Sequence, residues 1–226
     1  MYFIEKNLNK FKNNSYTYFL DPKEFNLVKS KLHKDEYKVY YPYKDSEKVI
    51  LYKRDIPEVL LYEIKSKVEL RHQDILGTMY SLNIDSSLFG DILLIDNRYY
   101  IYILPIVENY FISNFLMVKN TKVELEKLDI NYLKDYERSY EKLEFIVSSL
   151  RIDTVVSSIC HTGRSNISDM IKKKEIMLNY DYLKNPDYKL KDKDTFSIKR
   201  IGKFKFNGVL KSTKSDHIIV EVLKYI

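Results

Sequence analysis

Residues 151–179 read "RIDTVVSSICHTGRSNISDMIKKKEIMLN", and this stretch decides the architecture expected for the last third of the chain. Apolar residues recur at helical spacing on both sides of a turn that ends at Gly163. The pattern predicts one helix over residues 152–159 and a second helix that starts near Gly163. The positions expected to be buried are Val155, Val156, Ile159, Ile167, Met170 and Ile171.

Basic residues flank both of these predicted helices. Arg151 and Arg164 stand at the two helix starts, and the run Lys172–Lys174 ends the second helix. A helix N-terminus is electropositive and favours acids, so an arginine there is unfavourable for stability alone. Backbone N–H groups and a guanidinium can instead converge on one phosphate. The lysines by themselves only complement a helix C-terminus, but together with the arginines they favour an anion-binding surface.

The net charge of +6 is concentrated in the same part of the chain. Residues 151–226 hold 16 Lys and Arg against 9 Asp and Glu, a net charge of +7, whereas residues 1–150 hold 22 against 23. A polyanion such as RNA would be attracted to the basic part. A basic surface that serves solubility explains the charge alone equally well.

The remaining composition limits the class of protein. The 226 residues, 45% of them hydrophobic, suit two or three small domains. A single cysteine, Cys160, allows no internal disulfide and indicates a reducing compartment. No apolar run reaches the roughly 18 residues that cross a bilayer, and no signal-type segment opens the chain. We therefore expect a cytoplasmic protein with no membrane partner, and a monomer, since no coiled-coil seam is present.

The chain before residue 151 is expected to contribute two smaller domains and a linker. Asp21 and Pro22 predict a helix that runs to about Leu32, and two strands should follow across a polar turn at residues 44–46. These elements form an N-terminal α/β unit over residues 1–56.

The pattern of residues 57–130 predicts β-α-β-β-α-β, the ferredoxin-like or split βαβ arrangement. Its expected elements are a strand at 59–64, a helix at 72–82, a hairpin around Asn97-Arg98, a helix from Pro105 to about Met117 and a strand at 121–128. Many RNA-binding modules use this arrangement, but so do many unrelated proteins, so it assigns no function.

Residues 131–148 are expected to form a linker and then a strand, with Leu143, Phe145 and Val147 on one side. Strands are also expected at 195–201, 203–210 and 217–225, with a polar loop at 211–216. The predicted fold class is therefore α+β, with a C-terminal domain over residues 149–226.

The segments "RIDTVV", "GRSNISDMIKKKEIMLN" and "YKLKDKDTFSI" resemble the S4 (αL-type) RNA-binding domain. Preceded in order by "FLDP", "HQDILG", "GDIL" and "SSLRID", they make the chain similar to the YlmH-type S4 proteins of bacteria over nearly its whole length. The chain departs from the family at three positions. Lys174 and Lys193 replace glycines that are usual in the family, and Gln73 replaces the arginine of a His-Arg-Asp motif.

The resemblance implies a non-enzymatic protein whose partners are rRNA of the large ribosomal subunit and tRNA. Related proteins hold peptidyl-tRNA on stalled large subunits during ribosome-associated quality control. Asp153 is expected to fix Arg151 or to cap its helix rather than to touch RNA. The RNA-binding positions that the resemblance implies are Arg151, Arg164, Ser165, Lys172, Lys173 and Lys174.

We expect no catalytic residue, metal, cofactor or small-molecule substrate. Arg151-Ile152-Asp153 superficially resembles the Arg-Leu-Asp of pseudouridine synthases, but no catalytic domain follows it, and the 5 glycines form no cofactor loop. His72 and Asp74 could form an acid–base pair, although an acid is also favoured in a first helical turn. Two alternatives stay open: an RNA-modifying enzyme with a site around residues 72–74, and an adaptor in which residues 1–145 bind a protein partner.

Overall fold

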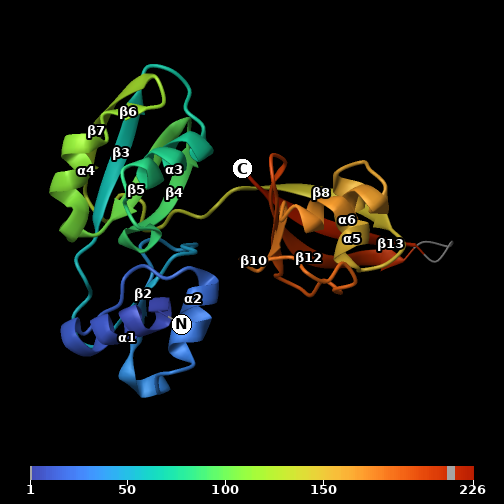
Figure 1. Ribbon diagram of the computed structural model, residues 1–226, viewed down its shortest axis with the longest axis horizontal. Coiled ribbons are helices and arrows are strands. Elements are labelled where there is room, and N and C mark those ends of the chain that lie inside the picture. Colours follow the sequence, from blue (N-terminus) through green and yellow to red (C-terminus); the bar gives the residue numbers. More distant parts are fainter. Residues whose placement is uncertain (1, 213–216) are drawn as a thin grey trace. The chain divides into compact units, whose positions relative to one another are not determined.

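The computed structural model describes residues 2–212 and 217–226 and divides into two compact units (Figure 1). The N-terminal unit is Met1–Glu137 and the C-terminal unit is Arg138–Ile226. Helices and antiparallel sheets occur in both units, so the α+β class expected from the sequence is confirmed. No helix within the described ranges is both long enough and apolar enough to cross a bilayer.

The N-terminal segment begins with two helices and a two-stranded sheet. Its elements are α1 (Tyr2–Asn14), α2 (Pro22–Lys29), the 3-10 turn η1 (Lys34–Glu36), β1 (Lys38–Tyr40) and β2 (Ile50–Tyr52). The predicted start of α2 is confirmed by a capping box, because the Asp21 side chain accepts from the Glu24 N–H at 2.8 Å and the Glu24 carboxylate accepts from the Asp21 N–H at 3.0 Å. The helix ends at Lys29 rather than Leu32, and α1 was not predicted.

The middle of the chain has the predicted β-α-β-β-α-β order, with one short additional strand. Its elements are β3 (Leu60–Ser66), α3 (His72–Ser81), η2 (Ser86–Leu88), β4 (Phe89–Ile95), β5 (Arg98–Ile103), η3 (Pro105–Val107), α4 (Glu108–Asn114), β6 (Met117–Val118) and β7 (Thr121–Leu128). The strands lie antiparallel in the order β4-β5-β3-β7-β6. Met117, expected in a helix, instead opens β6.

The β4–β5 hairpin turns one residue earlier than expected. Asp96 and Asn97 have φ values of 48° and 61°, so they form the two-residue loop, and Arg98 is the first residue of β5. Two successive positive φ values are typical of a type I′ turn, whose twist matches that of the flanking strands.

Both faces of this sheet carry apolar cores. Ile64 lies on the face that packs against α3 and α4, whereas Leu61 and Tyr102 lie on the opposite face. Phe19 and Tyr43 of the N-terminal segment cover that opposite face. Because the segment and the middle domain share a core, residues 1–56 pack as part of one larger unit.

Residues 131–148, expected as a linker and strand, divide between the two units. Leu133 is buried in the N-terminal unit, and the rings of Tyr43 and Tyr136 lie 5.8 Å apart. Strand β8 (Tyr140–Val147) instead pairs along its whole length with β13 (Ile218–Tyr225) of the C-terminal unit. Single apolar residues in a polar stretch give no period, so the sequence does not reveal that they reach a core.

The C-terminal unit contains both predicted helices over a six-stranded sheet. Besides β8 and β13, its elements are α5 (Ile152–Ile159), α6 (Arg164–Lys172), β9 (Ile176–Leu178), β10 (Asp181–Tyr182), β11 (Thr195–Ile198) and β12 (Gly202–Ser212). The strand order is β10-β9-β11-β12-β13-β8, and every pair is antiparallel. The β9–β10 hairpin was not predicted. Of the polar loop expected at 211–216, residues 213–216 lie outside the described ranges.

The helices α5 and α6 pack on one face of this sheet (Figure 1). Val155, Val156 and Ile167 are fully buried against sheet residues such as Phe196 and Val220. The burial predicted from helical spacing is therefore confirmed for these residues and for Ile159, whereas Met170 and Ile171 are only partly buried. The packing leaves the remaining sides of α6 facing solvent, where a partner could reach them.

Candidate nucleic-acid interface

The start of α5 is held by a segment that comes later in the chain. The Ile152 N–H donates to the Tyr188 carbonyl at 2.8 Å, and the Leu190 N–H donates to the Leu150 carbonyl at 3.0 Å. Arg151, the N-cap residue of α5, lies between these two contacts. Its backbone forms an isolated antiparallel β-bridge with Lys189. Residues 185–190 therefore run directly beside the helix start.

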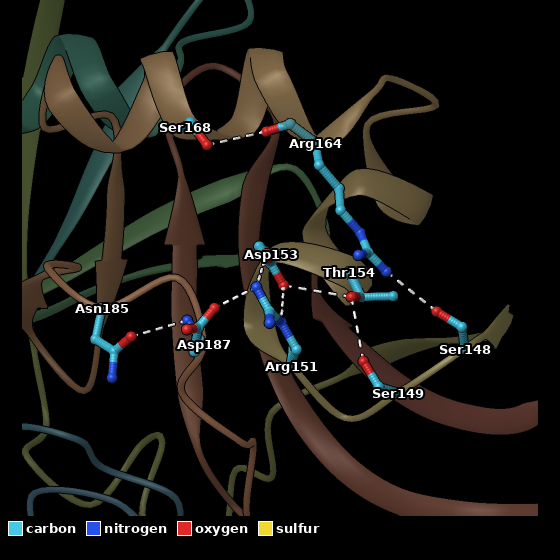
Figure 2. A network of polar contacts seen from close by, with 9 residues as sticks. All are labelled: Ser148, Ser149, Arg151, Asp153, Thr154, Arg164, Ser168, Asn185 and Asp187. Atoms are coloured by element: carbon cyan, nitrogen blue, oxygen red, sulfur yellow. Dashed lines mark hydrogen bonds and ion pairs between the residues drawn. The ribbon is translucent and has the colours of Figure 1, made fainter.

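Arg151 is held by two carboxylates at this helix start (Figure 2). Its Nε and Nη2 donate to the two carboxylate oxygens of Asp153 at 3.1 and 2.7 Å, and Nη2 also pairs with Asp187. The expectation that Asp153 fixes Arg151 is confirmed. A phosphate would have to compete with both carboxylates for this guanidinium. Arg151 is therefore held by internal ion pairs in this structure, and its contact with RNA stays a prediction.

The Asp153 carboxylate is nearly enclosed, since its side chain is only 8% exposed. Burial raises its pKa, but the hydrogen bonds and charge of Arg151, with a further hydrogen bond from Thr154, outweigh burial and leave the pKa below its ordinary value. The Thr154 hydroxyl lies 3.3 Å from the Asp153 carboxylate and 3.3 Å from the Ser149 hydroxyl. At neutral pH this network contains an ionised carboxylate with all its partners internal.

Arg164 is placed differently. It is the first residue of α6, and its Nη2 donates to the Ser148 hydroxyl at 3.2 Å (Figure 2). Both side chains are exposed, and no acidic group among the described residues lies within ion-pair distance of Arg164. The N-cap residue Gly163 supplies no side-chain cap, and Ser165 is exposed beside Arg164. Arg164 and the uncapped backbone N–H groups thus belong to the same solvent-facing helix start.

The lysine run occupies the other end of the same helix. Lys172 is the last helical residue and contacts Asp169 at 3.2 Å, with both side chains well exposed. Lys173 is the C-cap residue, and Lys174 follows it with a φ of 56°. Lys172 lies eight positions after Arg164, which corresponds to about 12 Å of helix. The cations of α6 therefore suit several phosphates along a strand rather than one anion.

The helix ends in a Schellman motif. The Lys174 N–H donates to the Ile171 carbonyl at 2.9 Å, and the Glu175 N–H donates to the Met170 carbonyl at 2.9 Å. Lys193, the second position where the resemblance expects glycine, also has a positive φ of 71°. The left-handed backbone that favours glycine is therefore present at both positions. A side chain there costs about 1 kcal/mol or more.

The acid–base pair considered at the start of α3 depends on the Asp74 carboxylate, and this carboxylate has a structural role. Arg71 donates to both oxygens of Asp74 at 2.9 and 3.1 Å, and Lys119 contacts it at 2.9 Å. Hydrogen bonds from Arg71 and Lys119 lower the pKa of Asp74 to about 2. Such a carboxylate is a weak base at neutral pH.

The two remaining candidate chemistries were metal binding and thiol reactivity. Cys160 is half-buried, and burial raises the pKa of its thiol. In the part of the chain that the structure describes, no group of three or more His, Cys, Asp or Glu side chains is placed to hold a metal ion.

Sequence reasoning missed the residues that complete the network. Asp187 reaches Arg151 only through the fold, so no local pattern could have identified it. Ser148 follows β8 directly, and its contact with Arg164 depends on how β8 leads into α5. Asp153, by contrast, was visible as an acid two residues after Arg151.

Comparisons with known proteins give three matches. A family model described as "Putative RNA-binding domain in YlmH" matches residues 57–132. The "Ribosome-associated protein quality control protein P2" of Bacillus subtilis (strain 168) is 24% identical over 149 residues, which are 66% of this chain and 58% of that relative. This chain therefore spans less than two thirds of the relative's length. The solved structure "Cell division protein ylmH from Streptococcus pneumoniae" is 26% identical and matches 58% of this chain and 90% of its own, with a TM-score of 0.46.

Residues 57–132 thus match an RNA-binding domain model, which indicates the class of that part of the chain. The resemblance to YlmH-type proteins indicated by the sequence motifs is confirmed, and within this chain the RNA-binding family model covers residues 57–132.

Proposed function

We propose that this chain is a non-enzymatic, cytoplasmic protein that docks on the large ribosomal subunit through its C-terminal unit, which we assign to the S4 class. In this proposal it acts as a monomer and stabilises peptidyl-tRNA on stalled subunits during ribosome-associated quality control. Its middle domain is of the ferredoxin-like type. The name of the Bacillus subtilis relative supports the quality-control role.

The observation that carries the proposal is the exposed helix α6 with cations at both ends. Arg164 has no acidic partner among the described residues, and Lys173 and Lys174 are exposed at the opposite end. Cations spaced along a helix can contact successive phosphates and release their counterions. A basic surface that served only solubility would not require an arginine at an uncapped helix start.

The enzyme alternative has no comparable support. Asp74 is held by two cations, and the pair proposed for catalysis would need a carboxylate that can exchange protons near neutral pH. The adaptor alternative places the function in residues 1–145 and predicts that changes in α6 weaken only localisation. Both alternatives are separated from the leading proposal by the experiments below.

The first test is co-sedimentation of the full-length protein with purified large ribosomal subunits at several salt concentrations. Arg164→Ala and the double variant Lys172→Ala/Lys173→Ala should each reduce the bound fraction. Each lost phosphate contact should also flatten the slope of log affinity against log salt by about one unit. The matched control is Lys142→Ala, which removes an exposed lysine from β8 in the same unit and should bind like wild type.

The proposed docking surface is wrong if both α6 variants co-sediment at wild-type levels with an unchanged salt slope. The tRNA step is tested separately, by comparing retention on large subunits with and without peptidyl-tRNA. Equal retention would contradict that step and leave docking intact. Mass mapping of rRNA nucleosides from a deletion strain addresses the enzyme alternative, since a missing modification would favour it.

A further inference from the structure

The middle domain matched by the RNA-binding family model is itself acidic. Residues 57–132 contain 7 Lys and Arg against 11 Asp and Glu, a net charge of −4. Long-range attraction of a polyanion is therefore weak there. If this domain contacts RNA, it must do so through specific groups on its surface rather than through its overall field.

One part of the sheet offers such groups. On the face that lies opposite α3 and α4, the N-terminal segment covers the apolar half of the sheet, where Leu61 and Tyr102 lie. The other half is polar and surrounds a hollow of about 550 Å³. Its chemistry-bearing lining residues are Glu63, Lys65, Asn97, Arg98, Glu126 and Tyr132.

Glu63 is the least expected residue in this hollow. It is only 8% exposed, and its carboxylate makes no hydrogen bond or ion pair with any residue that the structure describes, although the nearby charges of Arg98 and Lys65 attract it. Its direct neighbour across the β3–β7 ladder is Glu126, which already pairs with Lys65. Like charges directly opposite are destabilising, and a buried charge is costly unless it is paired. Such a carboxylate is suited to accept hydrogen bonds from a ligand.

Arg98 and Tyr132 provide the complementary chemistry. In β5, Tyr100 lies opposite Glu63, and Arg98, two residues earlier, points to the same face and also lines the hollow. The rings of Tyr100 and Tyr132 lie 6.0 Å apart with an interplanar angle of 35°. Tyr132 is 57% exposed, so Tyr100 supports its ring while much of it faces solvent. The hollow thus combines a buried acceptor, an exposed guanidinium and an accessible aromatic surface.

We propose that this hollow binds an unpaired guanine base of RNA, an inference that rests on the proposed RNA-binding function. The two Glu63 oxygens would accept from the adjacent N1–H and N2–H groups of guanine. Arg98 would donate to the guanine O6 and N7 acceptors, and the base would stack on Tyr132. Uracil fits poorly, because its single N–H lies between two carbonyl oxygens that a carboxylate repels. The volume lies in the range of about 300–1,000 Å³ that is usual for ligand sites.

The test uses the full-length protein and two fluorescein-labelled RNA hexamers, UUUGUU and UUUUUU, in fluorescence anisotropy titrations. Wild type should bind the guanine-containing hexamer roughly tenfold more tightly. Glu63→Gln should bring the two affinities to near equality, because an amide offers one acceptor and one donor. Tyr132→Ala should weaken binding of the guanine-containing hexamer by roughly tenfold. The matched control Glu58→Gln removes an exposed carboxylate outside the hollow and should keep the wild-type preference.

The proposal is overturned if wild type binds both hexamers equally, or if Tyr132→Ala retains both the affinity and the preference of wild type. Tyr132 is exposed, so this variant stays informative even where Glu63→Gln unfolds, which circular dichroism would reveal. A failed guanine preference leaves subunit docking through α6 untouched. Conversely, lost docking in the α6 variants with an intact guanine preference would refute the docking proposal alone.

Discussion

The starts of α5 and α6 look alike in the sequence but differ in the structure. Each begins with an arginine, Arg151 or Arg164, where the helix dipole disfavours a cation. Arg151 is held by Asp153 and Asp187, whereas Arg164 contacts only the exposed Ser148 hydroxyl among the side chains that the structure describes. The comparison shows that residue type and helix position do not identify an anion-binding group. The availability of the side chain decides it.

The difference has a local and a tertiary cause. An acid stands in the first turn of α5, but α6 has none in its first turn. Asp187 then joins Arg151 because residues 185–190 run beside the start of α5. No such segment supplies a carboxylate to Arg164 within the described residues. Arg151 is therefore paired within the fold, whereas the side chain of Arg164 stays exposed to solvent.

The largest expected effect of this comparison is on stability. Arg151→Ala leaves the buried Asp153 carboxylate without its guanidinium and should lower the free energy of unfolding by about 2 kcal/mol, a value discounted because Arg151 is 35% exposed. Thermal unfolding should shift by roughly 10 °C. Asp187→Ala removes only the exposed partner and should cost less than about 1 kcal/mol. Equal losses in both variants would show that Asp153 is not the important partner.

The ion pair between Arg151 and Asp153 also predicts that the free energy of unfolding depends on pH. The folded pKa of Asp153 lies below its unfolded value, so the unfolded chain binds more protons and stability rises with pH. This contribution is present above the unfolded pKa of about 3.9 and is lost as pH falls through the folded pKa. The difference in the free energy of unfolding between wild type and Arg151→Ala, measured with urea, should therefore become smaller below about pH 4. A gap that stays constant down to pH 2 would contradict this account.

At the end of α6, in contrast, a substitution by glycine should stabilise the protein. Lys174→Gly should raise the free energy of unfolding by about 0.5–1 kcal/mol, because glycine adopts the left-handed backbone without strain. Lys193→Gly should behave similarly. Lys173→Gly is the matched control, since Lys173 has a φ of −77° and glycine there should destabilise. Chemical denaturation measures all three, and stabilisation by the control would remove the backbone explanation.

The smallest expected stability effect belongs to Arg164. Arg164→Ala should change the free energy of unfolding by less than about 0.5 kcal/mol, because its side chain is exposed and bonded only to Ser148. The same variant should show the weakened subunit binding described above. If Arg164→Ala instead destabilises as much as Arg151→Ala, the two helix starts are equivalent and the comparison fails.

Much of the fold followed from local patterns. Helical spacing predicted α5 with its observed bounds, and Asp21-Pro22 predicted the start of α2. Alternating and apolar runs gave β3, β7 and the β4–β5 hairpin, since strands buried on a face repeat every two residues. The short β9–β10 hairpin and Leu133 were missed, because a few residues carry too little periodicity to predict a strand or a core contact.

The site was predictable only in part. The positions of Arg164 and Lys172–Lys174 on an exposed helix followed from the sequence, and so did the role of Asp153 as the partner of Arg151. The polar hollow around Glu63 was not anticipated. Glu63 lies in a strand that reads as apolar, and its surroundings come from β5, β7 and the segment that follows β7.

By itself, the sequence determined the kinds of element, the concentration of positive charge in the last third, and the family resemblance. These properties depend on composition and on spacing between near neighbours along the chain. Only the tertiary structure decided which charges are free, since Asp187 reaches Arg151 and Tyr132 reaches the Glu63 hollow through contacts between distant segments. Burial and pairing arise when those segments pack, and they determine whether a charged group serves the fold or a ligand.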